Sequence, residues 1–406
     1  MSASGQSAEA PPAARQPGWF LALFALAAAG GAIAYVPLLT VLLPQAIADL
    51  QGHEDVAALA QVTFLGAVVA SLANIGIGMI SDHARTRRPF IITGLIASNV
   101  LLLMVGEATG ITQIIVLVMV WQVSLNLMLS PLMAWAGDCF PDAQKGTLGG
   151  ALALSPALGA VAGSLVTWAG GVDPQARLAL VAVLVSALVL PAVLLGKGRA
   201  QAALMAAAPA PAPAPAPLPP RRERVVLRMW TARLMVQVAE GGMFAFLLYW
   251  LRSLAPGYPE NGAANIFSLV LISAVPVSLL LGRWSDRHRR PVAPLVGAAL
   301  LCAGGMLVMA AAQSLAWAIA GYVLFGLSAA VFLALHSGQT LRVLPAPQHR
   351  GRDLGFFNLT NTTPGMVMPG LTVLLVPQFG YEALFVLFAA LSLGSAALLA
   401  GFLRRP

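Results

Sequence analysis

The sequence predicts an all-α membrane protein with twelve transmembrane helices, arranged as two pseudo-symmetric bundles of six. Hydrophobic residues make up 59% of the 406 residues and charged residues only 9%, whereas soluble domains contain about 25% charged residues. The apolar residues form long blocks, and roughly 20 in a row allow a helix to cross a bilayer. Two loops of the first half also recur in the second half at a constant spacing.

Helix is the backbone state expected in the apolar blocks, because a lone strand in lipid leaves its polar groups unpaired. The first set of expected helices covers residues 19–43, 57–80, 89–107, 112–136, 147–170 and 176–196. The second set covers residues 229–251, 263–283, 291–312, 314–338, 353–377 and 381–403.

The ends of the two bundles are marked by changes in composition. Residues 1–17 are polar and rich in Ala, Pro and Ser, so we expect a disordered tail. The block Trp19–Leu43 is too long for a signal-peptide core and is expected to be an uncleaved first span. Residues 197–228 contain a Pro-Ala run that favours extended chain. They are the expected linker between the bundles 18–196 and 229–403.

The distribution of basic residues predicts the orientation in the membrane. Nearly all of the 23 Lys and Arg residues fall on the side that holds both termini and the linker, while Arg177 and Arg252 fall opposite. By the positive-inside rule, that side is cytoplasmic and the membrane is the cytoplasmic (inner) membrane. The net charge of +8 does not indicate a nucleic-acid partner, because the basic residues sit in short loops between apolar blocks.

One loop motif occurs twice. Residues 78–89 contain Gly-x-x-Ser-Asp followed by Arg-Arg-Pro, and residues 282–291 repeat the pattern. The Gly, Ser and Asp positions are each offset by 204 residues, and so are the Pro and Gln of a second loop pair, 141–146 and 345–351. Two loops with one offset indicate an internal repeat of the whole six-helix unit.

The chemistry of the repeated loop predicts a gate on the cytoplasmic side. Glycine at a helix end lets a neighbouring backbone approach closely. The aspartate can pair with arginine or face a helix N-terminus, and the arginines sit at the anionic leaflet. The candidate gating residues are Gly78, Asp82, Arg85, Arg87, Arg88, Gly282, Asp286, Arg287, Arg289 and Arg290.

The motif resembles the signature loop of the major facilitator superfamily, Gly-x-x-x-Asp-Arg-x-Gly-Arg-Arg, in both halves. The resemblance covers residues 18–403 and implies the major facilitator fold and transport by alternating access. His83 replaces the first basic residue of the pattern, and Arg289 replaces the glycine in the second copy. Within the superfamily the sequence looks most like the sugar–cation symporters and bacterial sucrose-carrier-like proteins, on residues 81–89, Asn126 with Ser130-Pro131, 138–146 and 350–358.

Ionisable groups inside the bilayer are costly and are therefore functional candidates. Glu240 lies near the middle of the expected helix 229–251 and could load and release a proton, or remain protonated and bond a neighbouring helix. His336 could relay a proton, although a gate or a satisfied buried histidine fits equally well. These two residues are the candidates for proton coupling.

Neutral amides and aromatic hydroxyls could bind a solute with hydroxyl groups. Gln122 and Asn126 share one helix face, with interhelical bonding as the alternative. Asn358 and Asn361 belong to a polar cluster before Pro364. The cluster could form a binding site or a gate, or it could bond the backbone groups that the proline leaves unpaired at a kink. In this superfamily the first, fourth, seventh and tenth helices line the cavity, which favours several of these positions. The candidate solute-binding residues are Tyr35, Gln122, Asn126, Gln237, Tyr249, Asn358 and Asn361.

The sequence lacks the motifs of common enzymes and of metal sites. The sequence has no phosphate-binding loop and no His-Glu-x-x-His, and its two cysteines offer no metal spacing, so we expect no enzyme activity, cofactor or metal. The expected function is proton- or cation-coupled transport of a small neutral solute, such as a sugar or glycoside, by a monomer in the lipid bilayer. A drug or metabolite exporter is the alternative, suggested by Ser155-Pro156 with Gly159, and a non-transporting receptor is the second.

Overall fold

The computed structural model describes residues 15–51, 56–84, 86–166, 176–196, 220–256, 258, 260–344 and 349–403, and within them every regular element is a helix. The first half contains α1 (Gly18–Pro37), a π-helical turn (Leu38–Leu42), α2 (Leu43–Gln51), α3 (Val56–Ala84), α4 (Arg88–Gly106), α5 (Ile111–Cys139), α6 (Lys145–Leu152), α7 (Leu154–Val166) and α8 (Arg177–Leu195). The second half contains α10 (Pro220–Leu254), α11 (Glu260–His288), α12 (Ala293–Ala310), α13 (Leu315–Val343) and α14 (Arg350–Ala400).

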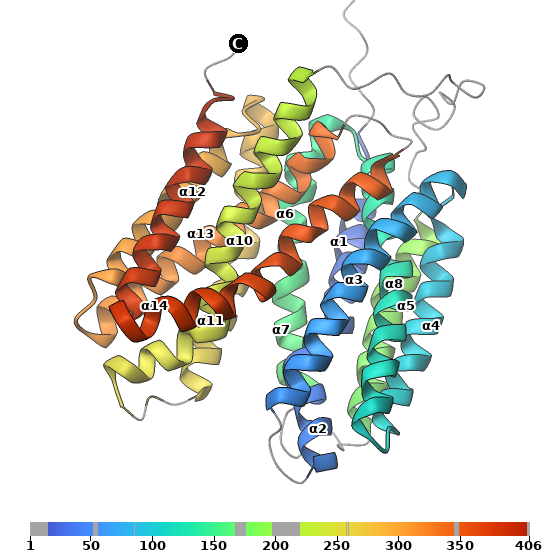
Figure 1. Cartoon of the computed structure of the whole chain (residues 1–406). Coiled ribbons are helices and arrows are strands. Elements are labelled where there is room, and N and C mark those ends of the chain that lie inside the picture. Colours follow the sequence, from blue (N-terminus) through green and yellow to red (C-terminus); the bar gives the residue numbers. More distant parts are fainter. Residues whose placement is uncertain are drawn as a thin grey trace, which may run out of the picture.

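Each half of the chain has its own hydrophobic core. The two helix bundles lie side by side (Figure 1). Phe20, Trp121 and Val185 are fully buried in the first core, and Phe325 and Phe388 in the second. Ten helices among the described residues are long and apolar enough to cross a membrane. Their outward faces carry large apolar side chains such as Leu72 and Leu280, each at least 65% exposed, as expected for surfaces that meet lipid rather than water. The all-α membrane fold predicted by the sequence is confirmed.

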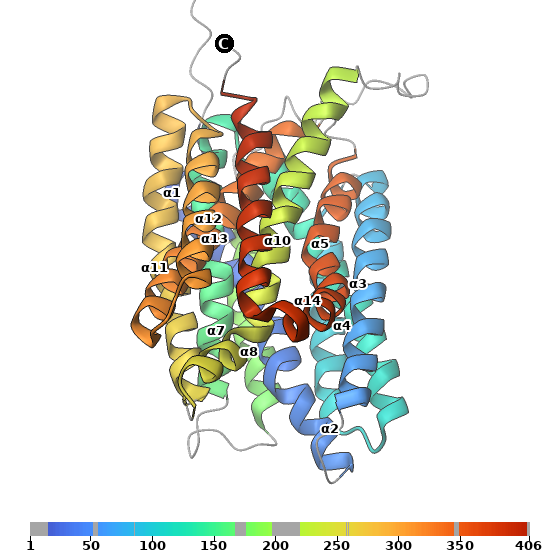
Figure 2. The same ribbon diagram turned by 60° about the vertical axis from the view of Figure 1, so that its left-hand side comes forward.

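The remaining two expected spans are helical but contain more polar residues. One is α10, which carries Arg233 and Glu240. The other is the first part of α14, which breaks at Gly380, where φ is 72° and ψ is −179°. Only glycine adopts that conformation readily, so the chain turns there and the last span runs back toward the C-terminus (Figure 2).

Two expected boundaries are corrected by the structure. The helix expected from residue 229 begins at Pro220, inside the predicted linker, because Pro favours the first turn of a helix and the following Arg-rich segment tolerates helix. Gln16, expected in a disordered tail, is only 4% exposed and bonds the Cys139 carbonyl at 2.8 Å and, through its backbone N–H, the Gln144 side chain at 2.7 Å. The linker residues 197–219 lie outside the described part of the chain.

The two repeated loops lie at the same end of the molecule, which we call the motif end. There α3 runs against the start of α14, and α6 runs against α11 and α13, so each bundle touches the other (Figures 1 and 2). The ribbons of the two bundles diverge toward the opposite end in Figure 1.

Candidate functional site

Asp82, close to the C-terminal end of α3, binds the first turn of α14 in the other half. Its carboxylate accepts hydrogen bonds from the backbone N–H groups of Gly351 and Arg352, both at 3.0 Å. Arg87 pairs with the same carboxylate at 2.7 Å. The first N–H groups of a helix lack partners within the helix and carry a partial positive charge, so a carboxylate stabilises them. We call this contact latch 1.

Asp286 makes the equivalent contact in the opposite sense. It lies near the end of α11 and accepts from the backbone N–H groups of Gly146 and Thr147 at 3.0 and 2.7 Å, and from the Thr147 hydroxyl at 2.7 Å. Arg342 pairs with it at 2.7 Å. We call this contact latch 2. Each half thus supplies one aspartate and one helix start, and the two latches are related by the internal repeat.

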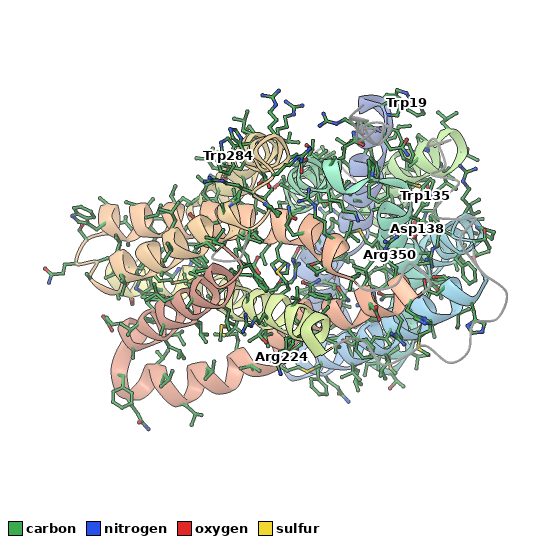
Figure 3. All side chains as sticks on the ribbon, turned by 90° about the horizontal axis from the view of Figure 1, so that it is seen from above. Trp19, Trp135, Asp138, Arg224, Trp284 and Arg350 are labelled. Atoms are coloured by element: carbon green, nitrogen blue, oxygen red, sulfur yellow. The ribbon has the colours of Figure 1, made fainter. Side chains whose placement is uncertain are left out.

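Latch 1 carries an additional ionic network. Asp138, at the end of α5, accepts from Arg87 of its own half at 3.1 Å and from Arg350 of the other half at 2.9 Å. Asp138 and Arg350 lie next to each other when the motif end is viewed from above (Figure 3). Their side chains are 14% and 6% exposed, so the pair is shielded from water. Ionic hydrogen bonds are stronger in such a buried setting than at the surface.

The glycines of the motif lie where the two halves are closest. A Cβ on Gly78 would meet the backbone carbonyl of Gly351, and a Cβ on Gly282 would meet that of Gly146. The reciprocal substitutions at Gly351 and Gly146 would clash in the same way. Paired glycines therefore set the distance at which the aspartates reach the helix starts.

The arginines predicted as gating residues do not all lie in the contact between the halves. Arg87 lies in latch 1, while Arg88 donates to the Gly196 carbonyl at 2.9 Å and lies 5.5 Å from the Trp135 ring centroid. Arg287, Arg289 and Arg290 are exposed, and Arg289 directly follows α11 with a φ of 54°. Arg85 lies outside the described residues.

Three residues of the motif end were missed as gating candidates: Asp138, Arg342 and Arg350. The repeat contained a signal for Arg342, because it stands 204 residues after Asp138 and ends the equivalent helix. The two positions carry opposite charges, so a search for identical residues passes over them. Only the fold brings Arg342, rather than the nearby Arg287, to Asp286.

A second cluster of polar side chains lies on α10. Arg233, Gln237 and Glu240 follow each other at intervals of four and three residues, which places them on one helix face. Glu240 is half-buried and interacts electrostatically with Arg233, with Tyr35 of α1 and with Tyr322 of α13. Tyr35 is 39% exposed. Glu240 therefore lies within electrostatic range of groups from both halves.

Arg233 was not among the predicted site residues. Its guanidinium donates to Thr360 and Asn361 of α14 at 3.1 and 3.3 Å, and to Ser337 and the Leu333 carbonyl of α13 at 3.1 and 3.2 Å. Asn361 in turn donates to Asn358 at 2.7 Å. The spacing of seven residues before Glu240 was a readable signal, since it puts two opposite charges two turns apart on one face.

The remaining candidates from the first half lie inside its own bundle. Asn126 accepts from Asn74 of α3 at 2.7 Å and donates to the Gln122 carbonyl at 2.8 Å. Gln122 is 7% exposed and Asn126 is 4% exposed. The Asn74–Asn126 bond joins α3 to α5 and is an interhelical bond of the kind given as the alternative for this pair, whose role in solute binding stays a prediction.

His336 is fully buried on α13. Its Nε2 lies 3.0 Å from the Met229 carbonyl and its Nδ1 lies 3.1 Å from the Thr340 hydroxyl. The rings of Phe332 and Phe357 flank it. Both ring nitrogens thus have partners. The side chain of Tyr249, the last candidate, lies outside the described part of the structure.

Comparison with known proteins identifies the class. The family model of the Major Facilitator Superfamily matches residues 18–335 and 229–406. The chain belongs to the major facilitator superfamily and is a membrane transporter, not an enzyme.

Among solved structures, the human organic anion transporter MFSD10 superposes with a TM-score of 0.70 at 15% identity, over 94% of this chain and 98% of that one. A bacterial homologue of the iron transporter ferroportin, in an outward-facing state with soaked iron, gives a TM-score of 0.70 at 15% identity, over 95% and 99% of the two chains. At this identity the similarity concerns the fold. No curated protein matches the sequence.

Proposed function

We propose that this protein is a proton-coupled secondary transporter of a small hydroxylated organic solute, and that it works by rocking of its two halves. The observation that carries this proposal is the pair of latches. Asp82 and Asp286 hold one end of the molecule closed through contacts between halves. These contacts are hydrogen bonds and ion pairs between two separate cores, so they can break and re-form without unfolding either core.

The motif end is proposed to face the cytoplasm. This orientation follows from the excess of Lys and Arg on the side of the repeated loops, the linker and both termini. On this proposal, formation of the latches closes the cytoplasmic end, and the latched state receives solute from the opposite side. Opening of both latches would then make the solute site accessible from the cytoplasm.

Glu240 is the proposed proton carrier. It is a carboxyl group on the face of α10 directed toward groups of both halves, and no hydrogen bond to it is formed by the described residues. Transfer out of water disfavours the ionised form of a carboxyl group. Proton binding and release at Glu240 can therefore couple to movements that change its contact with water.

The proposed solute class is that of the sugars and glycosides. The sequence resemblance to sugar–cation symporters motivates it, and the amides and hydroxyls next to Glu240 support it. Gln237 has a buried Oε1 without a hydrogen-bond partner in the described structure, and Tyr35 presents an exposed phenol. Both can bond solute hydroxyls.

The test is transport in proteoliposomes with and without a proton gradient, with a panel of radiolabelled sugars and glycosides. We expect Glu240→Gln to abolish gradient-driven accumulation and to leave exchange across the membrane at equal concentrations, because only the protonation step is lost. Glu107→Gln, at the end of α4, is the matched control and should accumulate solute normally. Unimpaired uphill transport by Glu240→Gln would refute the proton role. The direction of accumulation separates uptake from export.

A further inference from the structure

The α10 face contains a positive charge that the proposed function does not use. The Arg233 guanidinium is bonded to Thr360, Asn361, Ser337 and the Leu333 carbonyl, all of them uncharged. No carboxylate among the described residues lies within salt-bridge distance of it, although Asp82, Asp138, Asp286 and Asp353 each pair with an arginine. A charge held within a membrane bundle without a contact anion is costly, so a role for the charge is expected.

The charge that balances Arg233 is Glu240. The two groups interact across two turns of α10 without forming a contact pair. Gln237 lies between them on the same face, with its buried Oε1 unpaired in the described structure. The face thus offers a cation, an unused amide oxygen and a titratable carboxyl in that order along the helix.

We propose that the solute is a hydroxylated organic acid, such as a sugar acid, whose carboxylate binds Arg233 while Glu240 takes up a proton. This inference rests on the proposed function and narrows the solute of the same site from sugars in general to hydroxylated solutes that carry a carboxylate. The amide of Gln237 and the phenol of Tyr35 would bond the solute hydroxyls, and the guanidinium would bond the carboxylate with charge-assisted hydrogen bonds.

Charge balance gives the coupling. Without solute, Arg233 and ionised Glu240 together are neutral. An added carboxylate would leave one excess negative charge in the site, and such a charge is expensive away from water. Uptake of one proton from water by Glu240 restores neutrality. The loaded site then holds Arg233, the solute anion and a neutral Glu240, so one proton travels with each monoanion.

Few other groups near the site could take up this proton in place of Glu240. Tyr35 faces Glu240 from α1, and Tyr322 and His336 lie on α13, with His336 on the Arg233 side. The sequence of α11 has no titratable residue between 261 and 282, and that of α14 has none between 354 and 380. Tyrosines remain protonated near neutral pH, and His336 has partners on both ring nitrogens. Glu240 is therefore the group to test.

The first experiment measures binding to the full-length protein in detergent by thermal shift. The probes are gluconate, glucuronate and galacturonate, each paired with its neutral analogue glucitol, glucose or galactose. We expect at least one acid to raise the melting temperature while its neutral analogue does not. Arg233→Gln should weaken binding of that acid by roughly 30-fold or more, since the bound carboxylate loses its charged partner. Arg224→Gln, an exposed arginine of the same helix, should change nothing.

The second experiment keeps the inference testable if Arg233→Gln does not fold. The acid that binds is added to lightly buffered wild-type protein under mildly alkaline conditions, and proton uptake is recorded with a pH dye. Wild type should take up one proton per anion bound, and Glu240→Gln should bind the anion with no uptake.

Three results would overturn the inference: no acid of the panel binds, a neutral sugar binds as tightly as its acid, or the anion binds without proton uptake in wild type. Failure here is distinct from failure of the proposed function. Proton-driven accumulation of a neutral sugar would support the transporter proposal and contradict an organic acid as the solute. Arg233-dependent anion binding without any transport in proteoliposomes would support the anion site and contradict the transporter proposal.

Discussion

At the scale of single residues, the two latch aspartates have the clearest physical role. Each is a negative charge placed on unpaired N–H groups at the start of a helix from the other half. Hydrogen bonds to a charged group contribute about 1.5–3 kcal/mol each. The cost of opening the motif end is therefore concentrated in a few side chains, which makes the equilibrium between states easy to shift by mutation.

Asp286→Asn tests this role. The variant keeps the shape of the side chain but removes its charge, so we expect the closed state to lose about 1–3 kcal/mol, a population shift of roughly 5- to 150-fold. Spin labels on cysteines at His83 and Arg283, exposed ends of α3 and α11, would report it as a longer distance between halves. Cys139 and Cys302 are replaced first.

The matched control for Asp286→Asn is Arg287→Gln. Arg287 is the next residue of α11 and is exposed, with no ion pair to Asp286. Its distance distribution should equal that of the labelled parent. An unchanged distribution in Asp286→Asn as well would show that the aspartate does not hold the closed state.

At the scale of elements, glycine determines how α3 meets α14 and how α6 meets α11. Gly78 faces Gly351, and Gly282 faces Gly146, with no room for a Cβ. Close helix approach through small residues provides packing contacts between membrane helices. The same proximity brings Asp82 and Asp286 within hydrogen-bonding reach of the helix starts, so the glycines and the aspartates act together.

Gly78→Ala should separate α3 from α14 and destabilise the closed state, since the added methyl meets a backbone carbonyl that cannot move aside. We expect a loss of about 1–3 kcal/mol from overpacking. Gly76→Ala is the control, because it lies on the same helix and its Cβ would meet nothing within 4 Å. The distance between spin labels at His83 and Arg283 would be compared between the two variants. Equal distances would contradict a role for the glycine contact.

At the scale of the whole molecule, each half has its own hydrophobic core, and the two halves meet through glycine contacts, hydrogen bonds and ion pairs. The fully buried residues of each core come almost entirely from one half of the chain. Midway along the helices, Ser71 of α3 bonds Thr362 of α14, their hydroxyl oxygens 2.9 Å apart. Rocking of the halves would separate these two residues, whereas contacts within a half would persist.

A cross-link between the halves should therefore stop transport. We expect oxidation of Ser71→Cys with Thr362→Cys to abolish solute exchange and reduction to restore it, because the latched state can no longer open. The control joins Ala32 to Gly159, both of the first half, where the two Cβ positions are 3.4 Å apart. Its oxidised form should retain exchange. Loss of exchange in both pairs would argue against rigid-body movement.

Part of the site could be predicted from sequence because it depends on local pattern. The repeat identified Gly78, Asp82, Gly282 and Asp286, and the structure brings all four to the contact between halves. The repeat did not identify which arginine pairs with each aspartate. Arg287 precedes Arg342 by more than fifty residues and is adjacent to Asp286 in sequence, yet its helical direction takes it outward while the end of α13 brings Arg342 in.

Sequence by itself determined the membrane class, the approximate spans, the internal repeat and the superfamily. These follow from hydrophobicity and spacing, which are properties of the chain in order. Tertiary structure alone decided three contacts. Within the described part of the chain, Arg233 has only uncharged partners at hydrogen-bonding distance. Asn126 joins two helices of one bundle, and Asp138 pairs with Arg350 across the halves. Those facts depend on which helix faces meet, and packing of residues far apart in the chain sets that.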